Sequence, residues 1–174
     1  MGTLSSDVFT SFVSSLDEIN VSTLRRVCEA LFDADDEHRE FFSRRTLLLS
    51  ADGIEVRFLG VQLDKSDLDL WLAIARRART STPDFLISFS ASDVLHELQR
   101  HTGKQDHAWL REAMARLAGA GIKITLGRRH TWFLNGFLSY RADERRGHYV
   151  VMPSPPLLKL FKHPVFPRDC GARQ

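Results

Sequence analysis

Three aspartates lie close together in QLDKSDLDLWLAIARRAR, which spans residues 62–79. Carboxylates at this spacing can bind a divalent cation or transfer protons, but they can also begin a helix. If a helix starts just after Asp64, its side chain accepts hydrogen bonds from first-turn N–H groups, and Asp67 reaches back as in a capping box. Asp69 then complements the positive end of the helix dipole. Because no matching acidic or histidine motif occurs elsewhere, we interpret the cluster as a capped helix start.

Neither the seven histidines nor the two cysteines have the spacing of a metal site. His96, His101 and His107 are separated by five and six residues, unlike a zinc finger or a helical i, i+4 pair. Cys28 and Cys170 lie far apart, which favours two reduced thiols, with Cys28 in the core. The sequence also has no glycine-rich phosphate loop and no nucleophile elbow. We therefore predict no metal, no cofactor and no enzymatic activity.

Basic residues occur where a protein could contact DNA. A helix framed by HTGKQ and GAG carries polar residues opposite its apolar stripe. The candidate DNA-binding residues of this helix are Lys104, Gln105, His107, Ala108 and Arg111. Gln and Arg can hydrogen-bond to base edges, and Lys or a helix N-terminus can bind phosphate.

Two further basic clusters lie in predicted turns between strands. Arg128, Arg129 and His130 form the first, and we expect it to be the tip of a hairpin that follows the DNA backbone. The second consists of Arg145, Arg146 and His148. Each cluster alone is also compatible with a solvated surface, but together they coincide with elements that would dock on DNA.

The net charge of +2 hides an asymmetry along the chain. Residues 1–75 carry 7 Lys+Arg and 14 Asp+Glu, a net charge of −7, whereas residues 76–174 carry 17 and 8, a net charge of +9. This polarity is typical of a protein that meets a polyanion with one part, although an uneven solvated surface is the alternative.

Length and composition predict one ordinary globular domain. The 174 residues are 43% hydrophobic and 26% charged. Apolar runs are too short to span a membrane, and the N-terminus lacks the features of a signal peptide. We therefore expect a cytoplasmic protein with no membrane partner.

Hydrophobic periodicity indicates the elements that position the candidate residues. Residues 8–16 and 21–32 have apolar residues at helical spacing, and the acidic stretch DADDEHRE follows as a connection. Strand-like runs on either side of the Asp-Gly pair at residues 52–53 predict a hairpin. The capped helix comes next, then a short strand in FLISFS, and then a short helix capped by Ser90 or Ser92.

The period changes to two after residues 119–121. The stretch IKITLGRRHTWFLNGFLSYRADERRGHYVVM predicts three antiparallel strands with turns near residues 127–130 and 142–147, and LLKLFKH predicts a short closing helix. The aromatic residues expected in the core are Trp71, Trp109, Phe133 and Phe137. Trp132 alternates with Phe133, so it is the aromatic that could face outward and pack on a partner subunit or stack on a nucleotide.

The order helix, strand, helix, helix, hairpin is that of a winged helix, a helix-turn-helix variant. We therefore predict an α+β fold, a winged helix with N-terminal helices and a β-hairpin. The predicted organisation is N-terminal helices and acidic connection at residues 1–44, a winged-helix domain at 45–163, and a flexible tail or truncated linker at 164–174.

The sequence resembles the TrfA family of plasmid replication initiators from about residue 21 to residue 166. The similarity includes GIEVRFLGVQLDKSDLDLWLAIARRAR, the strand-rich stretch quoted above and SPPLLKLF. Its more specific parts are G-x-QLD-x-x-DLD-x-W and the strand GHYVV at residues 147–151. Members of this family carry two winged-helix domains and bind repeated origin sequences called iterons. The resemblance implies origin opening, recruitment of host initiator and helicase proteins, an active monomer and an inactive dimer.

The sequence ends where the second winged-helix domain of that family would begin, so we expect a truncated or one-domain relative. The resemblance implies that the first domain mainly holds phosphates. Our leading hypothesis is non-catalytic binding to double-stranded plasmid-origin DNA. The alternatives are an interaction module that dimerises or pairs with a full-length initiator to limit copy number, and a winged-helix transcription repressor.

Overall fold

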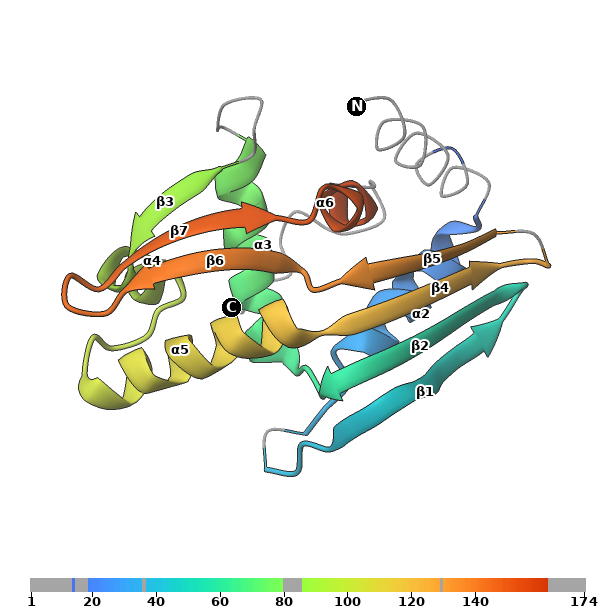
Figure 1. Cartoon of the computed structure of the whole chain (residues 1–174), viewed down its shortest axis with the longest axis horizontal. Coiled ribbons are helices and arrows are strands. Elements are labelled where there is room, and N and C mark those ends of the chain that lie inside the picture. The colour runs from blue at the N-terminus through green and yellow to red at the C-terminus, as the bar shows by residue number, and fades with distance from the viewer. Residues whose placement is uncertain (1–13, 15–18, 36, 80–85, 129, 163–174) are drawn as a thin grey trace.

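The computed structural model describes residues 14, 19–35, 37–79, 86–128 and 130–162. Its elements, in chain order, are α2 (Val21–Leu31), β1 (Phe41–Ala51), β2 (Ile54–Val61), α3 (Lys65–Arg79), β3 (Ile87–Ser90), α4 (Ala91–Glu97), α5 (Lys104–Gly119), β4 (Gly121–Leu126), β5 (His130–Asn135), β6 (Leu138–Asp143), β7 (His148–Pro153) and α6 (Pro155–Lys162). Figure 1 shows two sheets that follow each other along the long axis of the molecule. The predicted helix at residues 8–16 and the tail at 164–174 lie outside the described residues.

The larger sheet is antiparallel and has the strand order β1-β2-β4-β5. The predicted hairpin is confirmed: β1 and β2 are joined at Asp52 and Gly53, whose φ angles of 51° and 79° are the positive values that a two-residue turn requires. One face of this sheet contributes Val56, Phe58 and Ile122 to the core, where they meet buried residues of α2. Figure 1 shows α2 on the far side of the sheet.

The smaller sheet is also antiparallel and has the order β3-β7-β6. Strand β3 pairs with β7 from Ile87 opposite Val151 to Ser90 opposite His148. The hairpin beside β3 is therefore β6–β7, and the β4–β5 hairpin belongs to the other sheet. The prediction of three strands after α5 was wrong, because the chain forms four strands and divides them between two sheets.

The chain changes sheets at Gly136. This glycine has a φ of 81°, and a Cβ at this position would lie 2.5 Å from the carbonyl oxygen of Ala118. The Gly136 N–H donates to the Ala120 carbonyl over 2.7 Å, and the Phe137 N–H donates to the Leu117 carbonyl over 2.8 Å. The break between β5 and β6 is thus held against the end of α5. Alternating hydrophobicity continues through this break, which is why the sequence pattern did not reveal it.

Aromatic side chains join the elements in the centre of the molecule. The Trp71 ring centroid lies 5.2 Å from that of Phe137 and 5.9 Å from that of Phe161, and Phe32 lies 5.4 Å from Phe137. These contacts connect α3, α6, the start of β6 and the end of α2. The prediction of Trp71 and Phe137 as core residues is confirmed.

The two adjacent aromatics of β5 face the opposite way from the prediction. Trp132 is 8% exposed and Phe133 is 59% exposed. Because successive residues of a strand point to opposite faces, a shift of one residue exchanges the two orientations. Trp109, also predicted as core, is half-buried on α5.

The predicted α+β class with antiparallel sheets is confirmed, and so is the order of the helices and of the strand from α3 to α5. The winged helix itself stays a prediction. Among the helices that the structure describes, none is long and apolar enough to cross a membrane.

Candidate nucleic-acid interface

The aspartates that suggested a metal site begin helix α3. The Asp67 N–H donates to Asp64 Oδ1 over 2.9 Å, and the Asp64 N–H donates to Asp67 Oδ2 over 3.2 Å. Ser66 Oγ also donates to Asp64 Oδ1, over 2.7 Å. This reciprocal pair is the predicted capping box. In the part of the chain that the structure describes, no group of three or more His, Cys, Asp or Glu residues is placed to bind a metal.

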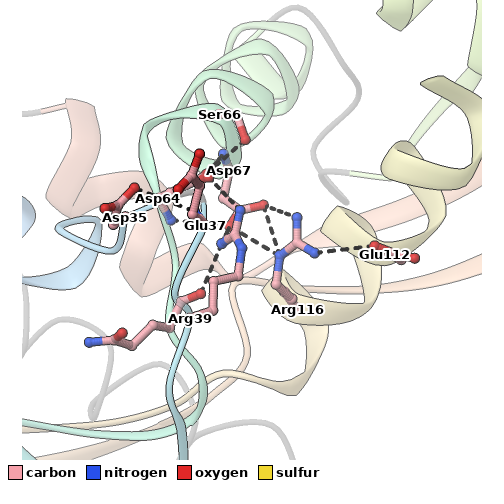
Figure 2. A network of polar contacts seen from close by, with 9 residues as sticks. Asp35, Glu37, Arg39, Asp64, Ser66, Asp67, Glu112 and Arg116 are labelled. Carbon is pink, nitrogen blue, oxygen red and sulfur yellow. Dashed lines mark hydrogen bonds and ion pairs between the residues drawn. The ribbon is translucent and has the colours of Figure 1, made fainter. Parts of the chain in front are cut away.

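Asp67 has a second role that the sequence analysis missed. Its side chain is fully buried and accepts hydrogen bonds from two arginines (Figure 2). Arg116 of α5 donates from Nη2 to Asp67 Oδ1 over 2.9 Å and from Nε to both carboxylate oxygens over 3.2 Å. Arg39, which precedes β1, donates from Nη1 to Asp67 Oδ2 over 2.8 Å and from Nη2 to Asp64.

This cluster, which we call the Asp67 network, consists of Arg39, Asp64, Asp67 and Arg116. It joins the segment before β1, the start of α3 and the second half of α5 through charge-assisted hydrogen bonds. Two arginines and two carboxylates balance each other, so no net charge is buried. The burial of Asp67 could have been predicted from its position in the sequence. It lies three, four and seven residues before buried residues of α3, which places it on the apolar stripe of the helix.

The connection between α4 and α5 is also fixed by specific contacts. Gln99 adopts a left-handed conformation with a φ of 56°. The next residue, Arg100, places its guanidinium 3.6 Å from the Trp109 ring centroid and 3.4 Å from an Asp106 carboxylate oxygen. Stacking and ion pairing at this position hold the first turns of α5 against the turn that precedes them.

Helix α5 buries one face and exposes candidate DNA-binding residues on the other. Its buried side chains are Leu110, Ala113, Met114 and Leu117. The exposed candidates are Lys104, Gln105 and Arg111, whereas His107 and Ala108 are half-buried. Neither Lys104 nor Arg111 makes an ion pair with any other residue in the described ranges. Their positive charges are therefore available to an external anion.

The β6–β7 turn brings a further basic pair to this end of the molecule. Asp143 Oδ1 accepts from the backbone N–H groups of Arg145 and Arg146, each over 3.2 Å. The Ala91 N–H donates to the Gly147 carbonyl over 2.7 Å and so attaches the turn to the start of α4. Both arginine side chains are exposed. Figure 1 shows the turn at the same end of the molecule as the start of α5.

Tyr149 of β7 follows this turn and is affected by the charge of Arg111 on α5. Burial raises the pKa of its hydroxyl above the ordinary value of 10.0, and the neighbouring Tyr140 raises it further, while the positive charge of Arg111 acts in the opposite direction. Arg111 is therefore close enough to β7 to act on it electrostatically. The structure thus gathers Lys104, Gln105, Arg111, Arg145 and Arg146 in one region, which we call the basic end.

The other predicted basic turn lies elsewhere. Arg128 and His130 are exposed at the β4–β5 turn, and Arg129 lies outside the described residues. The His130 ring stacks on that of Trp132, with 5.6 Å between the ring centroids. Helix α5 and strand β4 follow each other along the long axis (Figure 1), which separates this turn from the start of α5 by about 40 Å. DNA contact by these three residues stays a prediction, but they are not part of the basic end.

A crystal structure of domains 2 and 3 of RctB matches with a TM-score of 0.60 at 11% identity, covering 85% of this chain and 63% of that chain. A second structure of RctB domains 2–3 matches with a TM-score of 0.50 at 13% identity, covering 82% and 59%. The chain therefore shares its fold with these RctB domains.

This chain spans less than two thirds of the length of either RctB chain. No protein-family model matches the sequence. No curated protein matches it either. The resemblance to the TrfA family in particular stays a prediction, because the structural similarity concerns the fold alone.

Proposed function

We propose that this protein is a replication-initiator-like DNA-binding protein that binds duplex DNA without catalysis. The observation that carries the proposal is the basic end, where the start of α5, with its exposed cations, and the β6–β7 turn, with its exposed arginines, lie at the same end of the molecule (Figure 1). The similarity to RctB domains supports it, because that fold belongs to a replication initiator.

In this proposal α5 enters the major groove and β6–β7 is the wing. Helices α3, α4 and α5 with the β3-β7-β6 sheet have the element order of a winged helix. Gln105 and Arg111 are exposed on α5 and carry groups that can hydrogen-bond to base edges. Arg145 and Arg146 then hold phosphates on the adjacent backbone. This assignment transfers the wing from the β4–β5 turn predicted from the sequence to the β6–β7 turn.

The finer proposal is that the duplex is a plasmid origin with iteron repeats. Its support is the sequence resemblance to the TrfA family, which also suggests a dimeric state and host initiator and helicase proteins as partners. A winged-helix repressor would instead prefer its own promoter. Binding to an origin duplex, to a promoter duplex and to a scrambled duplex therefore distinguishes these functions.

Fluorescence anisotropy at several salt concentrations tests the basic end. The triple variant Arg111→Ala, Arg145→Ala, Arg146→Ala removes three cations, so the slope of log Kobs against log salt should flatten by about two to three phosphate equivalents. Arg128→Ala is the control, since it removes an exposed arginine in the turn of the other sheet, which lies away from the basic end, and in this proposal it should leave duplex binding unchanged. Wild-type binding that does not depend on salt, or an equal effect of both changes, contradicts the proposal.

A further inference from the structure

The four-stranded sheet has a second face, which lies opposite α2. Side chains of directly paired residues share a face, and one such row runs across all four strands. This row consists of Leu47, Arg57, Lys123 and Phe133. Polar residues Glu55, Thr125 and Thr131 form the adjacent row. We call these two rows, together with Arg45, the outer face.

Phe133 is the most exposed side chain of this row, with 59% of its surface accessible. Two cations lie over the ring: the Arg45 guanidinium carbon is 5.1 Å from its centroid, and Lys123 Nζ is 5.7 Å from it. Both distances are near the outer limit of about 6 Å for a cation–π contact. The ring is therefore bordered by positive charge and still accessible to a ligand.

The charges of these two cations are not balanced by a carboxylate of the described residues. Within those ranges, neither Arg45 nor Lys123 makes an ion pair, and the buried Nε of Arg45 has no hydrogen-bond acceptor. Arg57 in the same row does pair with Glu55, over 2.5 Å. The outer face thus has a net positive charge centred on an exposed aromatic ring.

An accessible aromatic ring with adjacent cations has the chemistry that recognises single-stranded nucleic acid. Every base has a planar face that can stack on such a ring, and the phosphates between bases bind the cations. Sheet surfaces with exposed aromatics bind two or three unpaired bases in this way. A second copy of the chain is a poorer occupant, since a symmetric contact would place the same cations against each other.

We propose that the outer face binds single-stranded nucleic acid, with one base stacked on Phe133 and phosphates held by Arg45 and Lys123. This activity goes beyond duplex binding at the basic end and uses different residues. The hydroxyl groups of Thr125 and Thr131 lie beside the ring position and can hydrogen-bond to a base or sugar.

Anisotropy of a fluorescein-labelled dT15 oligonucleotide tests this proposal. Phe133→Ala should weaken binding about tenfold, whereas Phe133→Tyr should bind like the wild type because it keeps the stacking ring. The double variant Arg45→Ala, Lys123→Ala should flatten the salt slope by about 0.7 for each phosphate that the variant no longer binds. Met152→Ala is the control: Met152 is 51% exposed on β7 of the other sheet, and its removal should leave binding unchanged.

An abasic oligonucleotide of the same length separates stacking from charge. It keeps the phosphates and lacks the bases, so Phe133→Ala should not weaken its binding further. The proposal is overturned if wild-type protein does not bind dT15, or if Phe133→Ala binds it unchanged. It is also overturned if polyglutamate of equal charge displaces dT15 as well as unlabelled dT15 does, or if light scattering shows that Phe133→Ala only dissociates a dimer. Duplex binding is measured in parallel, so failure here is distinguishable from failure at the basic end.

Discussion

At the scale of single residues, Asp67 connects the start of one helix with the position of another. Capping alone requires only that its carboxylate reach the Asp64 N–H. Asp67 is fully buried between Arg39 and Arg116, so its carboxylate has lost its hydration and depends on these two arginines for stabilisation. Separating the carboxylate from either arginine would leave a buried charge unpaired, and the three side chains therefore keep a fixed arrangement. The side chain therefore contributes, together with the shared hydrophobic core, to the position of α5, which carries much of the basic end, relative to α3.

Asp67→Asn tests this role. The amide keeps the shape of the side chain and its capping oxygen but removes the charge that two arginines share, so we expect a loss of about 3 kcal/mol in the free energy of unfolding. Urea denaturation followed by circular dichroism measures it. Glu112→Gln is the control, because Glu112 is 74% exposed and lies 3.9 Å from Arg116, and its replacement should cost no more than about 0.5 kcal/mol. Equal costs would mean that the network does not stabilise the fold.

At the scale of elements, Gly136 decides that β5 and β6 belong to different sheets. Its positive φ and its approach to Ala118 allow the chain to cross the end of α5. Without this crossing, β5 and β6 would continue as one strand. The β6–β7 turn would then not be placed beside the start of α5, and the basic end would lack Arg145 and Arg146.

Gly136→Ala should therefore destabilise the protein strongly. The new Cβ would lie 2.5 Å from a backbone oxygen, and the positive φ is itself unfavourable for alanine. We expect the free energy of unfolding to fall by about 3 kcal/mol or more. Gly127→Ala is the matched control, because Gly127 also has a positive φ, of 57°, but no heavy atom lies within 4 Å of the added Cβ. Its free energy of unfolding should fall by only about 1 kcal/mol. Thermal and urea denaturation measure both. A Gly136→Ala protein as stable as Gly127→Ala would contradict the close approach.

At the scale of the whole molecule, the two proposed surfaces belong to different sheets. The basic end is formed by α5 and the β3-β7-β6 sheet, and the outer face by the β1-β2-β4-β5 sheet. Figure 1 shows the two sheets one after the other along the long axis. In the two proposals, one sheet helps to hold a duplex and the other holds an unpaired strand.

The separation predicts that the two activities are independent. Changes more than about 10 Å apart with no shared partners have additive effects on free energy. In a protein that combines Phe133→Ala with the triple variant of the basic end, dT15 binding should fall by the same factor as in Phe133→Ala alone. Duplex binding should fall by the same factor as in the triple variant alone. Titrations of both ligands against all variants measure this. A triple variant that loses dT15 binding as strongly as Phe133→Ala would show that one surface serves both ligands.

Local sequence patterns correctly predicted the helices that lie within the described residues, the Asp-Gly hairpin and the capping box of α3. Each of these depends on interactions between residues close in sequence, such as the positive φ angles at residues 52–53 and the bond between Asp64 and Asp67. Such interactions leave a periodic or positional signal that can be read without knowledge of the partners. The exposed residues Lys104, Gln105 and Arg111 of α5 were found in this way.

Only the tertiary structure decided which basic turn accompanies α5 and which aromatic of β5 is exposed. Both depend on pairing between distant strands: β3 with β7, and β4 with β5. Two hairpins with similar basic turns have equivalent sequence patterns, and a register shift of one residue exchanges Trp132 with Phe133. The partners of Asp67 were hidden for the same reason, because Arg39 and Arg116 lie 28 and 49 residues away along the chain.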